Sequence, residues 1–566
     1  MRESSVPAIV TADPDDNLTD LLVRAARDRG TSVMFSRRVA GVWQDVTAER
    51  FEADVVALAK GLVASGVRAG DRVGIMSKTR YEWTLADFAI WSAGAVTVPI
   101  YETSSAEQVS WILSDSGAVA IFTETGAHTA TVAEVRDTLP ALRDVWSIDN
   151  GAVDELVEAG RGVDDTEIDG RRRSLRGDSV ATIIYTSGTT GRPKGCELTH
   201  ANFGDLAANA VARLGSVVSA PGASTLLFLP LAHVFARFIQ VLAVASGARL
   251  GHTADVKNLI EDLGGFRPTF VLAVPRVFEK IYNSAEAKAE AGGKGKIFHA
   301  AADTAIAWSQ ATDAGRVPLT LALRHALFDR LVYSRLRATL GGQVQYAVSG
   351  GAPLGTRLGH FFRGVGVTVL EGWGLTETTA PATVNTPEKI KIGTVGLPLP
   401  GVTVRVADDG ELLVKGVNVL RGYFNNAQAT AEAVEDGWFH TGDLGTLDAD
   451  GWLYFVDRKR DVIRRGGENM SSALIEKTLC EHPAVAEAAV IGVPDPVLGQ
   501  EVKAFIVARA PVTPDELRAF ATERLAKFQV PRLWEFRDNL PKTPTQRVEK
   551  YKLRQESGGG DKPLLG

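Results

Sequence analysis

Hydrophobic positions repeat with two alternating periods from about residue 50 onward. Phe51 to Ser65 has the spacing of an amphipathic helix, whereas Arg72 to Met76 and Val96 to Ile100 are short apolar runs typical of buried strands. The same alternation continues to about residue 380. Alternating strands and helices predict mostly parallel sheets that are covered by helices.

The pattern changes near residue 390 and again near residue 456. From 390 to 455, short strands such as Val402–Val406 are separated by turns, which predicts a β-rich subdomain. A second α/β unit follows the charged stretch Asp457 to Asp461. We therefore predict an α/β protein with a large N-terminal domain over residues 1–456, a small C-terminal domain over 457–554 and a flexible tail over 555–566.

Length and composition agree with several packed units. A chain of 566 residues exceeds what one hydrophobic core usually supports. Its 45% hydrophobic and 23% charged residues are ordinary for a globular protein. The net charge of −6 argues against nucleic acid as a partner.

Cysteine usage and apolar runs bear on the compartment. Cys196 and Cys480 are the two cysteines, and they lie too far apart in sequence to indicate a disulfide framework or a zinc site. The first residues lack the apolar core of a signal peptide, and no run approaches the roughly 18 apolar residues that read as a transmembrane helix. We expect a cytoplasmic protein with no transmembrane segment, while peripheral membrane contact through a surface patch stays open.

Residues 185–200 form the most informative segment of the chain. It reads Tyr-Thr-Ser-Gly-Thr-Thr-Gly-Arg-Pro-Lys-Gly-Cys-Glu-Leu-Thr-His, follows the strand-like run Ser179–Ile184, and leads into a helix that Thr199 can cap. Glycines let the backbone approach a ligand, hydroxyls can donate to it, and Lys194 adds a charge. The segment predicts a phosphate-binding loop, with a plain turn as the alternative. It does not fit a Walker loop, because Pro193 and Gly195 flank the lysine.

The segment resembles the phosphate loop of the adenylate-forming superfamily, which includes acyl-CoA synthetases, luciferases and the adenylation domains of peptide synthetases. Further motifs of that superfamily follow in its order: Pro230–Phe235, Ala273–Phe278, Val348–Leu354, Glu371–Thr378 and Gly437–Gly445. The resemblance therefore covers nearly the whole chain. The large domain, in Arg80–Trp83 and Tyr101–Gln108, is most similar to bacterial long-chain fatty acid CoA ligases, whereas the small domain resembles crotonobetaine and medium-chain CoA ligases.

This resemblance implies ATP, Mg²⁺ and coenzyme A as cofactors and a fatty acid of medium to long chain as the substrate. It implies a set of nucleotide- and CoA-binding residues, namely Thr186, Ser187, Gly188, Thr189, Thr190, Gly191, Gly350, Gly351, Ala352, Glu371, Gly372, Trp373, Gly374, Asp443, Arg458, Arg464, Gly466 and Gly467. The catalytic residues that it implies are Lys194, His233, Thr376, Glu377, Arg547 and Lys550, with Glu377 also the Mg²⁺ ligand.

The chemistry explains why such residue types are needed. A carboxylate that attacks the α-phosphorus of ATP builds negative charge on phosphate oxygens, so donors and a cation must be in place beforehand. By resemblance, Thr376 donates to the α-phosphate, Trp373 faces the adenine, and Asp443 accepts both ribose hydroxyls. His233 lies by the substrate carboxylate and the path of the thiol. Outside these motifs, each residue would read as ordinary core or solvated surface.

The C-terminal domain carries the second half of the implied mechanism. In the family this domain rotates about a hinge, here Arg460, and its loop Arg464–Asn469 then lines the pantetheine tunnel. Arg547 occupies the position of the family's adenylation lysine, and a planar guanidinium is not equivalent to an ammonium group. We predict that Arg547 bridges the substrate carboxylate and the α-phosphate, with Lys550 as the alternative.

The resemblance as a whole implies an ATP-dependent fatty acid–CoA ligase that forms an acyl-AMP intermediate. One alternative on the same fold activates an aryl or small branched acid. Another passes the acyl group to the pantetheine of a carrier protein. A third, suggested by Arg547, is a non-catalytic protein that binds a nucleotide or an acyl-adenylate.

Overall fold

The computed structural model describes residues 1–11, 13–186, 192–466, 468–543 and 548–558. Its contacts divide the chain into two compact units. The N-terminal unit comprises Ser4–Val404 and Val414–Phe439, and the C-terminal unit comprises Met1–Glu3, Arg405–Leu413 and His440–Gly566. Both combine strands with helices, so the predicted α/β class is confirmed. The domain boundary after residue 456 stays a prediction.

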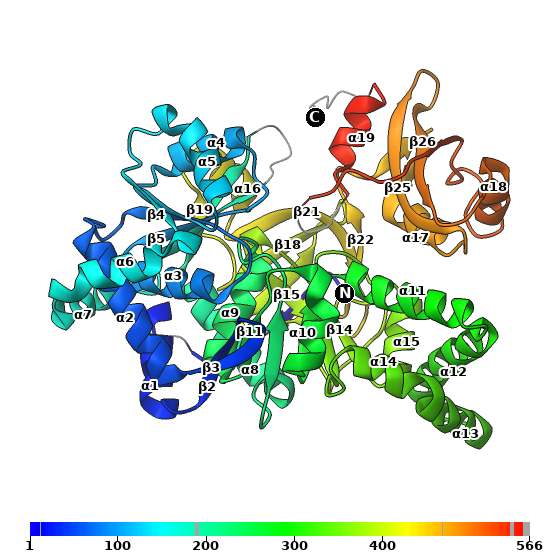
Figure 1. Ribbon diagram of the computed structural model, residues 1–566. Helices are drawn as coiled ribbons and strands as arrows, with labels where there is room; N and C mark the ends of the chain where they lie inside the picture. Colours follow the sequence, from blue (N-terminus) through cyan, green and yellow to red (C-terminus); the bar gives the residue numbers. More distant parts are fainter. Residues whose placement is uncertain (12, 187–191, 467, 544–547, 559–566) are drawn as a thin grey trace. The chain divides into compact units, whose positions relative to one another are not determined.

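A seven-stranded sheet forms the first layer of the N-terminal unit (Figure 1). Its strands, in order across the sheet, are β19 (Gly422–Tyr423), β9 (Lys194–Thr199), β8 (Val180–Thr186), β5 (Val96–Ile100), β4 (Arg72–Met76), β6 (Ala120–Thr123) and β7 (Asp144–Ser147). The strands from β8 to β7 run parallel, whereas β9 is antiparallel to β8. The strands predicted at residues 72–76 and 96–100 are confirmed as β4 and β5.

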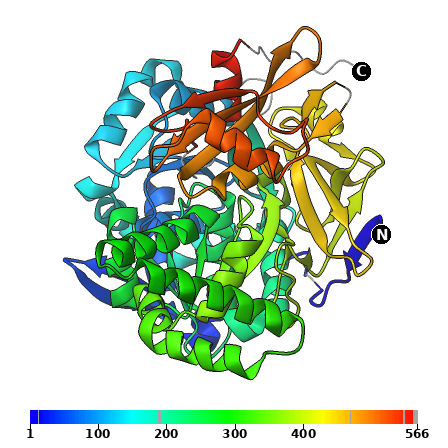
Figure 2. The same cartoon turned by 90° about the vertical axis from the view of Figure 1, so that its right-hand side faces the viewer.

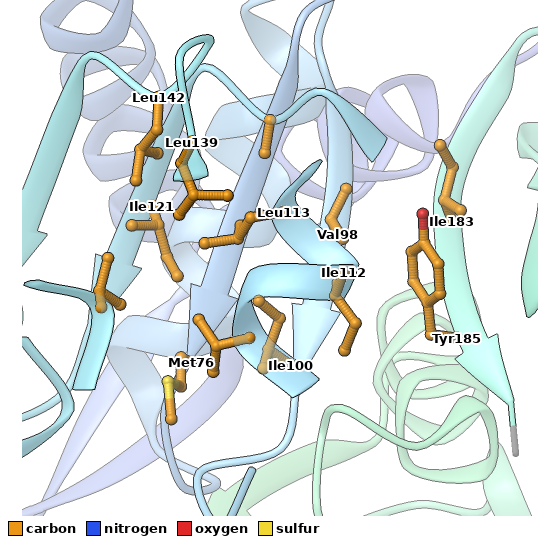
Figure 3. Packing of buried hydrophobic residues seen from close by; sticks show 13 residues of the cluster. Met76, Val98, Ile100, Ile112, Leu113, Ile121, Leu139, Leu142, Ile183 and Tyr185 are labelled. Atoms are coloured by element: carbon orange, nitrogen blue, oxygen red, sulfur yellow. The ribbon is translucent and has the colours of Figure 1, made fainter. Parts of the chain in front are cut away.

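Helices pack against this sheet and complete its core (Figure 3). They include α3 (Tyr81–Ser92), α4 (Ala106–Ser116), α5 (Gly126–Glu134) and α6 (Ala152–Ala159), while α2 (Ala48–Ala64) and α7 (Asp165–Arg173) pack on α3. Val98, Ile100 and Ile121 from the strands pack with Ile112 and Leu113 of α4, and all five are buried. Burying a leucine or isoleucine side chain contributes about 1.5–3 kcal/mol, so this cluster is a main source of stability for the layer. The predicted helix Phe51–Ser65 corresponds to α2.

The N-terminal unit contains two further sheets that bear on the site. One has the order β12 (Phe270–Ala273), β13 (Tyr346–Ser349), β14 (Thr368–Leu375), β15 (Ala380–Val384) and β16 (Leu397–Pro398), and the other has the order β10 (Ser224–Leu227), β11 (Arg249–His252), β2 (Val33–Val39) and β3 (Val42–Thr47). Their helices are α8 (His200–Val218), α9 (Val234–Ser246), α10 (Leu259–Phe266), α11 (Pro275–Ala291), α12 (Gly295–Asp313), α13 (Leu319–Phe328), α14 (Ser334–Thr339) and α15 (Thr356–Val365). The predicted cap of α8 is confirmed, because the Thr199 hydroxyl accepts from the backbone of Asn202.

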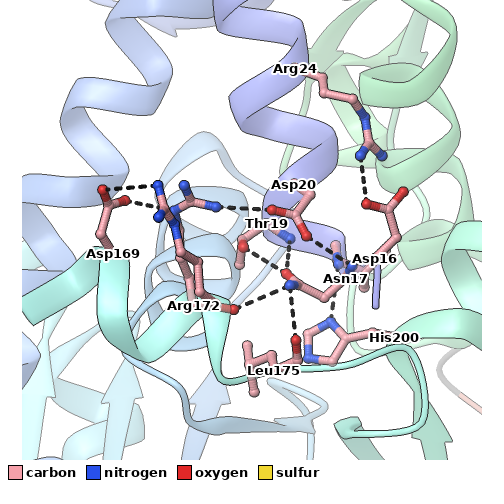
Figure 4. A network of polar contacts seen from close by, with 11 residues as sticks. Asp16, Asn17, Thr19, Asp20, Arg24, Asp169, Arg172, Leu175 and His200 are labelled. Atoms are coloured by element: carbon pink, nitrogen blue, oxygen red, sulfur yellow. Dashed lines mark hydrogen bonds and ion pairs between the residues drawn. The ribbon is translucent and has the colours of Figure 1, made fainter. Parts of the chain in front are cut away.

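A polar network joins α1 (Leu18–Arg29) to α7 and α8 (Figure 4). Asn17 caps α1, and its side-chain amide donates to the carbonyl oxygens of Arg172 and Leu175. The Arg172 guanidinium donates to Asp20 at 2.9 Å. The His200 ring accepts from the backbone N–H of Leu18. These bonds satisfy helix-terminal groups that would otherwise be buried without partners.

The C-terminal unit contains a five-stranded sheet with helices on it (Figure 2). Its strands are β24 (Glu468–Met470), β23 (Ile463–Arg465), β26 (Gly499–Ala508) and β25 (Val485–Asp495), with β27 (Leu533–Phe536) beside β26, and its helices are α17 (Ser472–Cys480), α18 (Pro514–Thr522) and α19 (Lys550–Glu556). The β-rich segment forms a separate sheet of β1 (Glu3–Val6), β17 (Val402–Val406), β18 (Glu411–Gly416), β21 (Trp438–Leu447) and β20 (Val434–Glu435), with β22 (Leu453–Arg458) beside β21. Within the described ranges, each helix is too short or too polar to traverse a lipid bilayer.

Candidate active site

Strands β8 and β9 carry the two ends of the predicted phosphate loop. They pair so that Thr186 at the end of β8 lies opposite Lys194 at the start of β9. The interpretation of residues 185–200 as one loop is therefore wrong for Lys194–Thr199, which form a strand. Gly195 permits this close pairing, because a Cβ atom there would lie 2.7 Å from Ile183 Cγ2. The glycine that suggested a loop instead serves strand packing.

Several predicted residues lie outside the described part of the chain. They are Ser187, Gly188, Thr189, Thr190 and Gly191 of the loop, Gly467, and Arg547. Their assigned roles stay predictions.

Glu377 lies beside strand β8, which leads into the loop, and strand β19. Its Oε1 accepts hydrogen bonds from the hydroxyl groups of Thr186, at 3.5 Å, and Tyr423, at 3.2 Å. The Thr186 hydroxyl also lies 3.7 Å from the Cys196 thiol. The Tyr423 ring is 5.2 Å, at its centroid, from Lys194 Nζ, within cation–π range. The carboxylate and the ammonium group predicted to act on the phosphates therefore contact the same tyrosine.

Two neutral groups surround the Glu377 carboxylate. Burial, together with the charge of Glu377, raises the pKa of the Tyr423 phenol. Burial also raises the pKa of the Cys196 thiol, and Glu377 adds to that shift. Both groups are protonated at neutral pH, so Tyr423 acts as a hydrogen-bond donor. Neither neutralises Glu377, whose negative charge is left to interact with a cation.

Gly374 allows β14 to bulge just before Thr376 and Glu377. The register of β14 against β15 shifts between Trp373 and Gly374. A Cβ atom at Gly374 would lie 1.7 Å from the carbonyl oxygen of Ala380, so no other residue fits this approach. Trp373 is buried, and its predicted contact with adenine stays a prediction.

The turn after Glu377 has a strained backbone. Thr379 and Ala380 both adopt left-handed conformations, with φ of 53° and 76°. Such conformations cost about 1–3 kcal/mol each in residues other than glycine and persist where surrounding contacts enforce them. The Thr379 hydroxyl donates to the Asn418 carbonyl oxygen at 2.8 Å, and the Asn418 amide donates to Thr378. These contacts fix the segment that carries Thr376 and Glu377.

The carboxyl ends of β13 and β14 bring two other motifs together. The strands are parallel, with Ser349 opposite Glu371. Glu371 Oε1 accepts from the backbone N–H of Leu354 at 2.9 Å, which ties down the turn containing Gly350, Gly351 and Ala352. Gly351 and Ala352 are exposed, and Gly351 has a φ of 85°. Ligands of α/β sheets bind at such carboxyl ends, so the location suits nucleotide binding.

His233 lies at the N-terminus of α9, next to this edge. Its Nδ1 accepts from the backbone N–H of Phe235 at 3.2 Å. A Cβ atom at Gly350 would lie 3.7 Å from the Phe235 ring and 3.8 Å from the Gly372 carbonyl oxygen. Three motifs that are far apart in sequence are therefore neighbours in space.

Asp443 and Arg458 are brought together within the C-terminal unit. They lie opposite each other in β21 and β22, and Arg458 Nε is 3.6 Å from Asp443 Oδ1. The Asp443 side chain is 5% exposed, and the Thr441 hydroxyl accepts from its backbone N–H. The charge of Arg458 compensates for the burial of this carboxylate.

Arg464 and Gly466 lie at the hairpin of β23 and β24. The Arg464 side chain is exposed, and Gly466 has a φ of 59°. The backbone N–H of Gly466 donates to the Leu498 carbonyl oxygen at 2.9 Å. The neighbouring Arg465 forms an ion pair with Glu501 at 2.7 Å, which anchors the hairpin and leaves Arg464 at the surface.

Lys550 is engaged in a partly buried ion pair. Its Nζ lies 2.7 Å from Glu476 Oε1 and donates to the Ser472 hydroxyl at 2.7 Å. Burial raises the pKa of Glu476, and Lys550 opposes that rise. Ser472 in turn donates to Asp457 at 2.9 Å. Lys550 therefore ties α19 to α17 in the C-terminal unit.

Two residues at the Glu377 cluster were missed by sequence reasoning. Tyr423 belongs to an Arg-Gly-Tyr-Phe stretch that matches no chemical motif, and Cys196 was considered only as a cysteine without a disulfide or zinc partner. They meet Glu377 because β19 pairs with β9, which places Tyr423 opposite Cys196. The pairing of strands distant in sequence was the missing information.

Comparison with known proteins supports the family that the sequence motifs suggest. The chain matches the AMP-binding enzyme family over residues 22–424 and the C-terminal domain of AMP-binding enzymes over residues 474–547. It is 51% identical to the long-chain-fatty-acid–CoA ligase FadD15 of Mycobacterium bovis over 503 residues, which are 88% of this chain and 84% of the relative. It is 32% identical to a feruloyl-CoA synthase from Amycolatopsis sp., over 89% of this chain and 92% of that protein.

A solved structure extends the likeness to the fold. The O-succinylbenzoate coenzyme A synthetase MenE of Bacillus subtilis, in complex with ATP and a magnesium ion, is similar with a TM-score of 0.74 and 26% identity. The match covers 95% of this chain and 99% of that one. The resemblance drawn from the sequence motifs is confirmed: this chain belongs to the family of AMP-binding enzymes, as an acyl-CoA synthetase of the adenylate-forming superfamily.

Proposed function

We propose that the chain joins a fatty acid of medium to long chain to coenzyme A and converts ATP to AMP and pyrophosphate. The observation that carries this proposal is the 51% identity, over most of both chains, to a long-chain-fatty-acid–CoA ligase. The aryl-acid alternative has weaker support, because the identity to the feruloyl-CoA synthase is 32%.

In the first half-reaction, the fatty acid carboxylate attacks the α-phosphorus and pyrophosphate leaves. We assign Lys194 to the outer phosphates and the Thr376 hydroxyl to the α-phosphate. His233 orients the carboxylate: since its Nδ1 accepts from Phe235, a neutral ring carries its proton on Nε2 and donates from there. The exposed Gly351 and Ala352 lie along the adenine, and buried Glu371 supports their turn.

The donor set around Glu377 suits a magnesium ion. Mg²⁺ prefers hard oxygen ligands and is usually held by one or two carboxylates together with substrate phosphates. The Glu377 carboxylate, with the Thr186 hydroxyl 3.5 Å away, offers such oxygens at the end of the phosphate loop. We assign the ion to Glu377. When bound, it supplies positive charge that offsets the charge on the phosphate oxygens.

Ribose and coenzyme A are assigned to the C-terminal unit. Asp443 accepts the ribose hydroxyls, and its contact with Arg458 keeps it oriented. Arg464 and Gly466, at the β23–β24 hairpin, border the path of the pantetheine, where the exposed guanidinium of Arg464 offers positive charge. For the bridging cation we assign Arg547, and the engagement of Lys550 with Glu476 supports that choice.

A panel of acids tests the proposal. The full-length chain is incubated with ATP, Mg²⁺, coenzyme A and one acid at a time, either a saturated fatty acid or an aryl acid. We expect AMP, pyrophosphate and a fatty acyl thioester, detected by mass, with the saturated acids. Product from aryl acids alone would support the alternative substrate. Bound nucleotide without pyrophosphate from any acid would support the non-catalytic protein.

The acceptor is tested in the same assay. Replacing free coenzyme A with a phosphopantetheinylated carrier protein is expected to abolish thioester formation. A thioester formed on the carrier but not on free coenzyme A would overturn this part of the proposal.

A further inference from the structure

Helix α13 and the π-helical segment Asp329–Tyr333 that follows it carry a row of exposed leucines. Leu319, Leu323, Leu327 and Leu331 are 75%, 64%, 57% and 50% exposed. Four residues advance about 40° beyond one helical turn, so the four side chains follow one side of the helix. In α13, which the structure describes in full, no residue is buried. A contiguous apolar row of this kind on a globular protein marks an interaction surface.

Helix α13 lies beside α12 (Figure 1), and His325, on the side opposite to the leucines, attaches it to neighbouring helices. The His325 ring stacks on Trp308 of α12 with centroids 4.5 Å apart. Its Nε2 lies 2.6 Å from the carbonyl oxygen of Gly364 in α15. These contacts fix the orientation of the helix, so the leucine row stays turned away from α12 and α15.

The stretch of sequence that carries the row is strongly basic. Residues 314–340 contain five arginines, Arg316, Arg324, Arg330, Arg335 and Arg337, and a single acid, Asp329. Asp329 is paired with Arg337 at 2.6 Å. The chain as a whole carries a net charge of −6, so the sign of the charge in this stretch is opposite to that of the whole chain.

We infer that the leucine row docks the protein on an anionic phospholipid bilayer. Leucines on one side of a surface helix insert at the boundary between headgroups and acyl chains, while flanking arginines pair with anionic headgroups and extend their stems along the apolar zone. A second copy of this chain is a less suitable partner for the leucine row, because the arginines near its own row would repel those of the first copy. The proposed function supplies a reason for the location, since fatty acids partition into membranes, but the geometry and charge of α13 stand without it.

Vesicle co-sedimentation of the full-length chain tests this inference. The vesicles are equimolar phosphatidylcholine and phosphatidylglycerol, or phosphatidylcholine alone, and no ATP, acid or coenzyme A is added, so the result is independent of the proposed activity. We expect binding to the anionic vesicles that L323S/L327S weakens by about tenfold or more. The control V497S, which alters an 86% exposed valine of the C-terminal unit, should bind like the parent chain.

A second variant, R316Q/R330Q, tests the contribution of positive charge. It should also bind anionic vesicles more weakly, and this binding should depend less on salt. Circular dichroism and thermal midpoints confirm that each variant is folded. Equal binding by the parent chain and L323S/L327S would overturn the inference. So would a dimer without vesicles that L323S/L327S dissociates, because the row would then join two copies of the chain.

Discussion

Tyr423 contacts both charged side chains of the proposed triphosphate site. Its hydroxyl donates to Glu377 at 3.2 Å and its ring lies near Lys194 Nζ. A hydrogen bond to a charged group contributes about 1.5–3 kcal/mol, and this one also holds the Glu377 carboxylate in one orientation. At the residue scale, we therefore treat Tyr423 as a positioning residue for Glu377.

Removing this hydroxyl tests that role. Y423F keeps the ring next to Lys194 and loses the donor to Glu377, so we expect the rate of pyrophosphate-dependent ATP exchange to fall about tenfold and its Mg²⁺ requirement to rise. The matched control is Y333F, which removes a buried hydroxyl that donates to Ala301 at 2.7 Å, in a different part of the unit. An unchanged Mg²⁺ requirement in Y423F would contradict the positioning role.

The two candidate cations of the C-terminal unit are separated by the same exchange assay. We expect R547A to lose most of its ATP–pyrophosphate exchange, because no other cation is assigned to the substrate carboxylate. K550A should keep its exchange but unfold at a lower temperature, since it leaves the partly buried Glu476 without its partner. Loss of exchange in K550A alone would transfer the assignment to Lys550.

At the scale of elements, β14 is a strand whose irregularity serves the site. The bulge at Gly374 and the left-handed turn at Thr379 and Ala380 redirect the chain immediately around Thr376 and Glu377. A regular strand would continue the pairing with β15 and would not present these two side chains at its end.

Substituting Gly374 measures how strictly this bulge is required. In G374A the new Cβ atom would meet the Ala380 carbonyl oxygen at 1.7 Å, so we expect a loss of about 3 kcal/mol in unfolding free energy, measured by denaturant titration. The control G264A alters an exposed glycine inside α10 with nothing within 4 Å, and it should gain about 0.5–1 kcal/mol. Equal stability of the two variants would show that the bulge relaxes freely.

The four-stranded sheet contains a pH-sensitive histidine. Burial lowers the pKa of His252, at the end of β11, to about 4, and its Nε2 lies 2.8 Å from the Thr84 hydroxyl. In the unfolded chain this histidine takes up a proton near pH 6.5, whereas in the folded chain it does so only near pH 4. The free energy of unfolding is therefore highest above pH 6.5 and decreases as the pH falls toward 4.

We expect H252F to flatten this dependence by about 1.4 kcal/mol per pH unit between pH 6 and 4, as measured by unfolding at a series of pH values. Phenylalanine suits the site, because Phe35 and Tyr81 already pack near the ring. An unaltered slope in H252F would place the proton uptake elsewhere.

At the scale of the whole molecule, local patterns predicted much of the architecture. The strands β4 and β5 and the cap of α8 agree with the sequence analysis, because each depends on residues that are neighbours in the chain. The residues of the sequence motifs, and the order in which the motifs occur, predicted the family. The strand β9 was missed because its glycine and lysine favour a loop locally, and pairing with β8 and β19 overrides that preference.

The site was less predictable than the fold. Motif residues such as Thr186, Glu377 and Gly350 could be named from the sequence, but their partners could not. The contact of Glu377 with Tyr423 requires strand β19 to lie beside β9, and the engagement of Lys550 with Glu476 requires α19 to pack on α17. Such contacts join segments distant in sequence, so no local pattern reports them.

The central claim is that the chain makes a fatty acyl thioester through an acyl-AMP intermediate. A single-turnover experiment tests it most directly: the full-length chain is mixed with ATP, Mg²⁺ and a long-chain fatty acid without coenzyme A, and coenzyme A is then added. We predict that acyl-AMP accumulates in proportion to the enzyme and is converted to acyl-CoA and AMP upon the addition. Failure to form acyl-AMP, or formation without conversion to the thioester, would contradict the account.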